Sequence, residues 1–114
     1  MKAVNGHKYI GFFDPQKDEP EILEDIEQYR RYNNMLNKGV VVQHIESCPL
    51  ALACAAEPAC IRRDIFTGER LADDGFYDDG CYRISRDFIH YYTHYDIGIP
   101  PEYERYLVEE IGIR

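Results

Sequence analysis

Three of the four cysteines recur at equal steps of six residues, at Cys48, Cys54 and Cys60. Structural zinc sites usually draw two ligands from one tight turn, where the cysteines lie closer together than this. On a helix, six residues rotate the chain by about 600°, so Cys48 and Cys54 would point about 120° apart. A free cysteine also behaves as a small buried hydrophobe. We therefore interpret these cysteines as structural side chains.

Cys48 is the thiol with a candidate catalytic role. It precedes Pro49 at the predicted start of a helix, where the helix dipole lowers the pKa of a thiol. His44 lies four residues earlier, at the end of a predicted strand, and would act as the base. The sequence supplies no third orienting group and no oxyanion loop. A thiol enzyme or redox sensor is therefore an alternative and not the leading hypothesis.

A second pair with possible chemistry is His90 and His94, which form an H-x3-H spacing. On a helix this spacing places both imidazoles on one face, the geometry that binds zinc in H-E-x-x-H enzymes. Asp87, one turn earlier, would be a third metal ligand. Tyr91 stands where those enzymes have their glutamate base, so we favour a histidine pair packed among tyrosines over a metal site. We expect no cofactor.

Composition limits the class of protein. The 114 residues predict one domain (1–114) with a single core. No run approaches the roughly 20 apolar residues that span a bilayer, and the N-terminus lacks the apolar stretch of a signal peptide, so we expect a cytoplasmic protein without membrane contact. The net charge of −8 repels phosphate. Direct binding of nucleic acid is not expected, and a basic protein is the expected partner.

Apolar periodicity, caps and turn residues predict an α+β fold. The sheet is expected to be mostly antiparallel with about three to five strands, packed by an N-terminal amphipathic helix and a C-terminal helix. A β-α-β unit at the start of the chain is one arrangement consistent with the order of elements. The predicted strands lie at 7–13, 40–46, 60–66 and 80–85. The predicted helices lie at 19–39, 48–57, 86–96 and 100–112, and acidic turns are expected between 66 and 80.

Acidic and tyrosine side chains gather in a few segments. Carboxylates are expected to form two charged surfaces, and the tyrosines are expected to supply contact area with a polar tip. The first surface consists of Asp18, Glu21, Glu24, Asp25 and Glu27. The second consists of Asp73, Asp74, Asp78 and Asp79. The anchoring tyrosines are Tyr91, Tyr92, Tyr95 and Tyr103.

Small size, negative charge and the lack of a catalytic motif in the sequence predict a non-enzymatic binding protein. In the sharper hypothesis, its carboxylates imitate phosphates and occupy the basic groove of a nuclease or other nucleic-acid-handling protein. Acidic antirestriction and anti-CRISPR inhibitors from phages and mobile elements act in this way, and the analogy rests on size and charge alone. One alternative is a metal- or thiol-dependent protein that uses Cys48 with His44 or His90 with His94. Another is a homodimeric structural module.

Overall fold

Seven strands form two sheets in the described part of the chain. The structure, a computed structural model, describes residues 2–4, 7–12, 19–51, 61–73 and 75–113. The strands are β1 (Lys2–Val4), β2 (His7–Ile10), β3 (Leu50–Ala51), β4 (Ile61–Arg63), β5 (Arg70–Asp73), β6 (Phe76–Asp79) and β7 (Tyr82–Ser85). Five of them form one sheet in the order β1-β2-β7-β6-β3, and β4 pairs with β5 in a separate two-stranded sheet.

Most neighbouring strands of the main sheet are antiparallel, as predicted. The pairs β1–β2, β6–β7 and β3–β6 are antiparallel, and β2–β7 is parallel. In the parallel pair Ile10 lies beside Ile84, and both side chains are fully buried. Pairing in this register therefore places two apolar side chains on the same covered face of the sheet.

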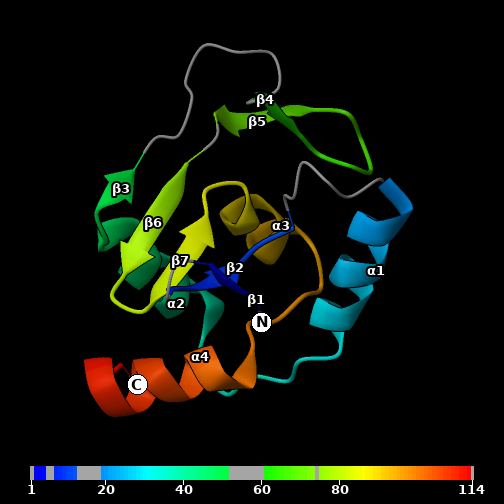
Figure 1. The fold of residues 1–114 in the computed structure, drawn as a ribbon. Coiled ribbons are helices and arrows are strands. Elements are labelled where there is room, and N and C mark those ends of the chain that lie inside the picture. The colour runs from blue at the N-terminus through cyan, green and yellow to red at the C-terminus, as the bar shows by residue number, and fades with distance from the viewer. Residues whose placement is uncertain (1, 5–6, 13–18, 52–60, 74, 114) are drawn as a thin grey trace.

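Four α-helices of the described residues surround this sheet. They are α1 (Glu19–Arg30), α2 (Lys38–Ser47), α3 (Phe88–His94) and α4 (Pro101–Tyr106), and α4 continues as a π-helical turn at Leu107–Ile111. Figure 1 shows α2 and α3 behind the sheet, α1 along one flank and α4 across one end. Within the described residues, the structure contains no helix whose length and apolar character would allow it to cross a bilayer. The α+β class predicted from the sequence is confirmed.

The predicted helices at 86–96 and 100–112 are confirmed as α3 and α4. Pro101 occupies the first turn of α4, where its missing N–H costs no helical hydrogen bond. Gly112 ends the π-helical turn with a φ of 82°, a left-handed conformation that glycine adopts without a steric penalty. The two ends of this segment therefore follow directly from the residues that stand there.

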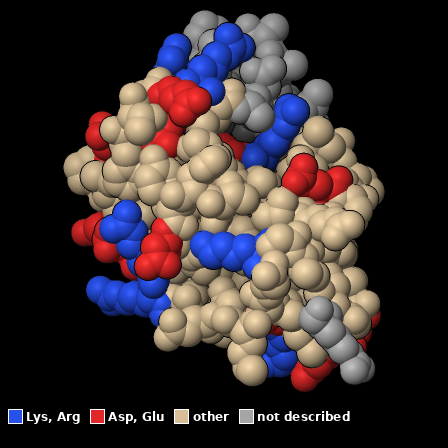
Figure 2. All heavy atoms as spheres, turned by 180° about the vertical axis from the view of Figure 1, so that it is seen from behind, with Lys and Arg blue, Asp and Glu red and all other residues tan. Residues whose placement is uncertain are grey.

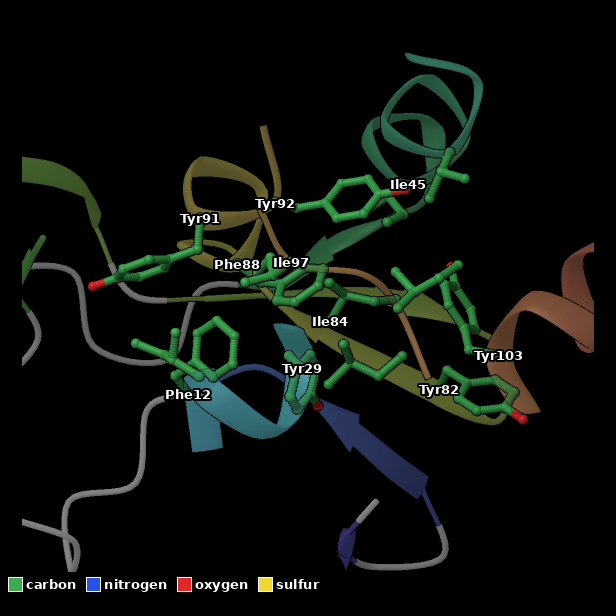
Figure 3. Close-up of a cluster of buried hydrophobic side chains, with 14 of the residues drawn as sticks. Phe12, Tyr29, Ile45, Tyr82, Ile84, Phe88, Tyr91, Tyr92, Ile97 and Tyr103 are labelled. Atoms are coloured by element: carbon green, nitrogen blue, oxygen red, sulfur yellow. The ribbon is translucent and has the colours of Figure 1, made fainter. Parts of the chain in front are cut away.

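Aromatic and branched side chains from every layer meet in one core (Figure 3). The rings of Phe12 and Tyr29 lie 4.8 Å apart edge to face, and those of Tyr82 and Tyr103 lie 4.9 Å apart. Such offset and edge-to-face contacts add about 0.5–1.5 kcal/mol per pair to the burial of apolar area. The helices contribute Ile26 and Tyr29 of α1, Val41 and Ile45 of α2, Phe88, Tyr91 and Tyr92 of α3, and Tyr103 of α4.

The predicted strand at 40–46 is wrong, because these residues belong to α2. Asn37 is the N-cap, and its side chain accepts a hydrogen bond of 2.8 Å from the backbone N–H of Gly39. Val41 and Ile45, one helical turn apart, are both fully buried. A β-branched run favours a strand locally, but the cap and the buried i, i+4 pair outweigh that preference. The β-α-β arrangement is replaced by a parallel pairing of β2 with β7.

Helix α1 is shorter than predicted and ends at Arg30. The carbonyl of Tyr29 accepts a hydrogen bond of 3.0 Å from the N–H of Gly98. The Asn34 side chain then donates to the carbonyl of Ile99 and accepts from its N–H, at 3.0 and 2.8 Å. A Cβ on Gly98 would lie 2.5 Å from Asn34 Oδ1. This close approach of two distant segments requires glycine and diverts the chain from the helix.

Two other segments also differ from the prediction. Residues 50 and 51 form β3 inside the predicted helix at 48–57, because the carbonyl of Pro49 accepts a hydrogen bond of 2.8 Å from the N–H of Asp78 and draws the chain along β6. The remainder of that predicted helix lies outside the described residues. The region predicted as turns contains β5 and β6, and β4 pairs with β5.

Candidate functional site

Helix α2 and the end of β6 bring three side chains of different chemistry together. His44 and Cys48 lie four residues apart at the C-terminal end of α2. The Nε2 atom of His44 lies 2.9 Å from Oδ2 of Asp79 and 3.8 Å from Sγ of Cys48. Within the described residues, these three form the one group whose imidazole nitrogen, thiol and carboxylate atoms all lie within 4.8 Å of one another.

Tyr103 of α4 completes this cluster. Its hydroxyl donates a hydrogen bond of 2.7 Å to Oδ2 of Asp79, the oxygen that also faces His44. Tyr103 is fully buried and Asp79 is only 6% exposed, whereas His44 and Cys48 are partly exposed. Burial and the hydrogen bond to the Asp79 carboxylate raise the pKa of Tyr103 far above its ordinary value. The hydroxyl therefore remains a donor to Asp79 at any ordinary pH.

The arrangement is not that of an activated cysteine nucleophile. In such sites the thiol contacts one imidazole nitrogen and the orienting acid holds the other, but here Cys48 and Asp79 both face Nε2 of His44. Cys48 is also the C-cap of α2 and not the start of a helix. Burial, followed by the charge of Asp79, raises the pKa of the Cys48 thiol to about 11. A thiol in this state is protonated and unreactive at neutral pH.

A second cluster joins α3 to the loop between β4 and β5. Oδ2 of Asp64 faces Nε2 of His90 at 2.7 Å and accepts a hydrogen bond of 2.5 Å from the Tyr95 hydroxyl. Its other oxygen accepts the backbone N–H groups of Phe66 and Thr67. Burial by itself raises the pKa of Asp64, but the hydrogen bonds from Tyr95 and His90 outweigh it, and the pKa lies below its ordinary value. This carboxylate holds the loop in place.

The histidine pair of α3 lies as the H-x3-H spacing predicts, with the two ring centroids 4.7 Å apart. The proposed third ligand does not join it, since among the described residues His90, His94 and Asp87 do not form a group of metal-ligand geometry. Asp87 instead accepts a hydrogen bond from the Ser85 hydroxyl. Asp64, to which sequence analysis assigned no role, is the carboxylate that His90 contacts.

The first predicted acidic surface lies on α1. Ile26 and Tyr29 face the core, and Glu24 and Glu27 are exposed. A rotation of about 100° per residue places these two glutamates on the side of the helix opposite the buried pair. Glu27 contacts Arg30 at 2.7 Å, one of the exposed ion pairs that add little stability. Carboxylates thus stand at the surface of α1 without a role in packing.

The other predicted acidic residues differ in position. Figure 2 shows that acidic side chains on the face behind the sheet gather toward its margins. Glu21 and Asp78 are exposed, Asp25 is partly buried, and Asp79 is buried and so does not belong to a charged surface. Asp18, Asp74 and the side chain of Asp73 lie outside the described residues. The second acidic surface is therefore represented in the structure by Asp78 alone.

The tyrosines proposed as contact area belong mainly to the core. Tyr91, Tyr92 and Tyr103 are at most 3% exposed, and Tyr95 is partly buried against Asp64. The aromatic area of Tyr91, Tyr92 and Tyr103 packs in the core and does not reach the surface. The spacing of apolar residues along the two helices was a sufficient signal for this packing.

Two members of the His44 cluster, Asp79 and Tyr103, were not recognised as such from the sequence. Asp79 was assigned to the charged surface because it follows Asp78 in a turn-like sequence, but alternate residues of a strand face opposite sides. Asn37 was the local signal for α2, since asparagine is a preferred N-cap. Recognising that helix would have placed His44 and Cys48 on one face.

Comparison of the chain with protein-family models, with curated proteins and with solved structures finds no match. The functional argument therefore depends on the chemistry and positions of the residues described above.

Proposed function

We propose that this protein is a small, non-enzymatic binding protein whose acidic α1 surface docks on a basic protein. The observation that carries the proposal is the exposure of Glu24 and Glu27 on the side of α1 opposite buried Ile26 and Tyr29. Cys48 and Asp79 both face Nε2 of His44, so the cluster lacks the arrangement that activates a cysteine nucleophile, which favours binding over catalysis. The net charge of −8 steers a basic partner toward the protein over long range.

The sharper form of this proposal is inhibition of a nucleic-acid-handling protein. A basic groove that binds phosphates would also attract a helix that presents carboxylates one turn apart. The inhibitor would then occupy the groove and exclude the nucleic acid. The location in the cytoplasm belongs to the same proposal.

Competition with nucleic acid tests this form of the proposal. Tagged protein is used to capture partners from host lysate at low and high salt, and bound proteins are identified by mass spectrometry. The proposal predicts that the captured partner is a basic protein and that high salt releases it, because salt screens exposed charges. Duplex DNA or RNA should also release it. A captured protein that nucleic acid cannot displace would contradict phosphate mimicry.

The homodimer hypothesis stays a prediction. Light scattering at two protein concentrations checks it, since a dimer in exchange with its monomer gives a molar mass that rises with concentration.

A further inference from the structure

We propose that Cys48, His44 and Asp79 are the protein ligands of a divalent transition-metal site of the zinc type. A thiol sulfur, an imidazole nitrogen and a carboxylate oxygen lie within 4.8 Å of one another. These are the three ligand types that zinc takes in proteins, and the hard cations calcium and magnesium favour oxygen alone. The site is independent of the acidic surface of α1, so either proposal can fail without the other.

Two of the distances between the ligand atoms are close to those that a tetrahedral ion requires, and the third lies within 4.8 Å. Zinc bonds of about 2.0–2.3 Å place neighbouring ligand atoms of a tetrahedron about 3.3–3.7 Å apart. In the structure Sγ of Cys48 lies 3.8 Å from Nε2 of His44, and that nitrogen lies 2.9 Å from Oδ2 of Asp79. The imidazole nitrogen and the carboxylate oxygen would have to separate by about 0.4 Å to reach the tetrahedral spacing.

Ordered secondary structure supplies all three ligands. His44 lies in the last turn of α2, and Cys48 caps that helix one turn later, so both side chains lie on one face. Asp79 is the last residue of β6, before the turn at Gly80. The hydrogen bond from the N–H of Asp78 to the carbonyl of Pro49 ties the chain after α2 to this strand. The ligands are thus held near one another before any ion binds.

Tyr103 provides the outer contact that metal-binding carboxylates usually have. Its hydroxyl donates to Oδ2 of Asp79 at 2.7 Å from a fully buried position on α4. Hydrogen bonds of this kind fix the orientation of a ligand, and their loss costs about 10- to 100-fold in metal affinity. Tyr103 is therefore a positioning residue for the proposed site and not a ligand.

Proton balance is simple for this ligand set. When the metal binds Sγ of Cys48, the thiol proton is released to solvent. Binding through Nε2 of neutral His44 requires that the imidazole proton reside on Nδ1. The Asp79 carboxylate binds without proton loss. Three protein ligands leave the fourth tetrahedral position for a water molecule or another ligand. The partial exposure of His44 and Cys48 gives solvent access to that position.

Cobalt(II) is the probe of choice, because a cobalt–thiolate bond gives a near-ultraviolet charge-transfer absorption and a tetrahedral site gives strong visible bands. Metal-free protein is titrated with Co²⁺, and Zn²⁺ is then added. We expect both absorptions to appear with one ion per chain and to be removed by zinc. Absence of the thiolate absorption would overturn the proposal.

Matched variants assign the absorption to its ligands. Cys48→Ser should abolish the thiolate band, and Cys81→Ser, which removes an exposed thiol, should leave it unchanged. Likewise His44→Ala should weaken cobalt binding at least tenfold, and His94→Ala, at an exposed histidine, should not. A band that survives in Cys48→Ser would place the metal on other thiols and overturn the site. Circular dichroism of each metal-free variant establishes that the fold is retained.

A measurement on wild-type protein keeps the test independent of variant folding, and one further variant tests the role of Tyr103. In wild-type protein, excess Zn²⁺ should raise the melting temperature, because the ion binds the folded state. Tyr103→Phe should lower cobalt affinity about 10- to 100-fold while keeping the same absorption bands. An unchanged melting temperature at millimolar zinc, or an unchanged affinity in Tyr103→Phe, would contradict the proposed geometry.

Discussion

His44 and Asp79 lie 2.9 Å apart between Nε2 and Oδ2, although 35 residues separate them in the chain. The same carboxylate oxygen accepts the Tyr103 hydroxyl at 2.7 Å. One buried side chain therefore connects the end of α2, the end of β6 and the middle of α4. Because buried polar groups are costly when unpaired, Asp79 specifies how these three elements pack.

Asp79→Ala should destabilise the fold strongly. The change leaves the buried Tyr103 hydroxyl and the His44 nitrogen without their partner, at a cost of about 2–4 kcal/mol in the free energy of unfolding. Asp78→Ala removes the exposed neighbouring carboxylate and should change that free energy by less than about 0.5 kcal/mol. Urea unfolding of both variants measures the difference. Equal effects at the two positions would show that Asp79 is not the connecting residue.

Two buried tyrosines should respond in opposite ways to loss of their hydroxyl. The Tyr92 hydroxyl is buried and has no hydrogen-bond partner among the described residues, so Tyr92→Phe should leave stability unchanged or raise it. Tyr103→Phe removes a donor from Asp79 and should cost about 1 kcal/mol. Paired thermal and urea unfolding check this order, and a destabilised Tyr92→Phe protein would reveal a partner for that hydroxyl.

Stability should fall at alkaline pH. Burial raises the pKa of Tyr91 and of Tyr92 to about 12, and the hydrogen bond to Asp64 raises that of Tyr95 to about 12. In the unfolded chain these groups titrate near their ordinary value of about 10. Their contribution is therefore fully present below about pH 10 and is lost as the pH rises from 10 to 12. The melting temperature measured across this window, with phenolate absorbance in parallel, should fall as the tyrosines ionise. Ionisation of all ten tyrosines near pH 10 while the protein stays folded would contradict this prediction.

Thiol reactivity should distinguish Cys48 from Cys81. With a pKa of about 11, Cys48 is ionised in only about one molecule in a thousand at pH 8. Cys81 is exposed. In metal-free native protein at pH 8, Cys81→Ser should remove one fast-reacting equivalent of a disulfide reagent, and Cys48→Ser should remove none. Loss of a fast equivalent in Cys48→Ser would restore the thiol-enzyme hypothesis.

Local signals predicted the last two helical segments of the chain well. Pro101 and Gly112 mark the ends of the last helical segment, and apolar spacing places Tyr103 on its inner side. The local sequence therefore specifies both the bounds of this segment and the side that is buried. The same reasoning failed at 40–46, where three consecutive valines favour a strand. There the cap at Asn37 and burial of Ile45 decide the structure, and burial depends on contacts that the local sequence does not specify.

The candidate site was predictable only in part. His44 and Cys48 were paired from their spacing, but the helix that brings them together was predicted as a strand. Asp79 is joined to them only by the pairing of β6 with β3 and β7, a long-range event without a local signal. Its burial beside exposed Asp78 follows from strand alternation, which becomes visible once β6 is known to be a strand.

The central claim is that carboxylates of α1 bind a basic partner, and matched charge reversals test it most directly. Glu24→Lys/Glu27→Lys alters the exposed side of α1, and Glu109→Lys/Glu110→Lys alters two exposed acids of the C-terminal segment. Each glutamate-to-lysine change removes one negative charge and adds one positive charge. Both double variants therefore change the net charge from −8 to −4. Capture of the partner from lysate by each variant, at low salt, is compared with capture by the wild-type protein. We predict that the α1 variant loses the partner and the C-terminal variant retains it. Equal capture by both variants, or equal loss, would contradict a binding surface on α1.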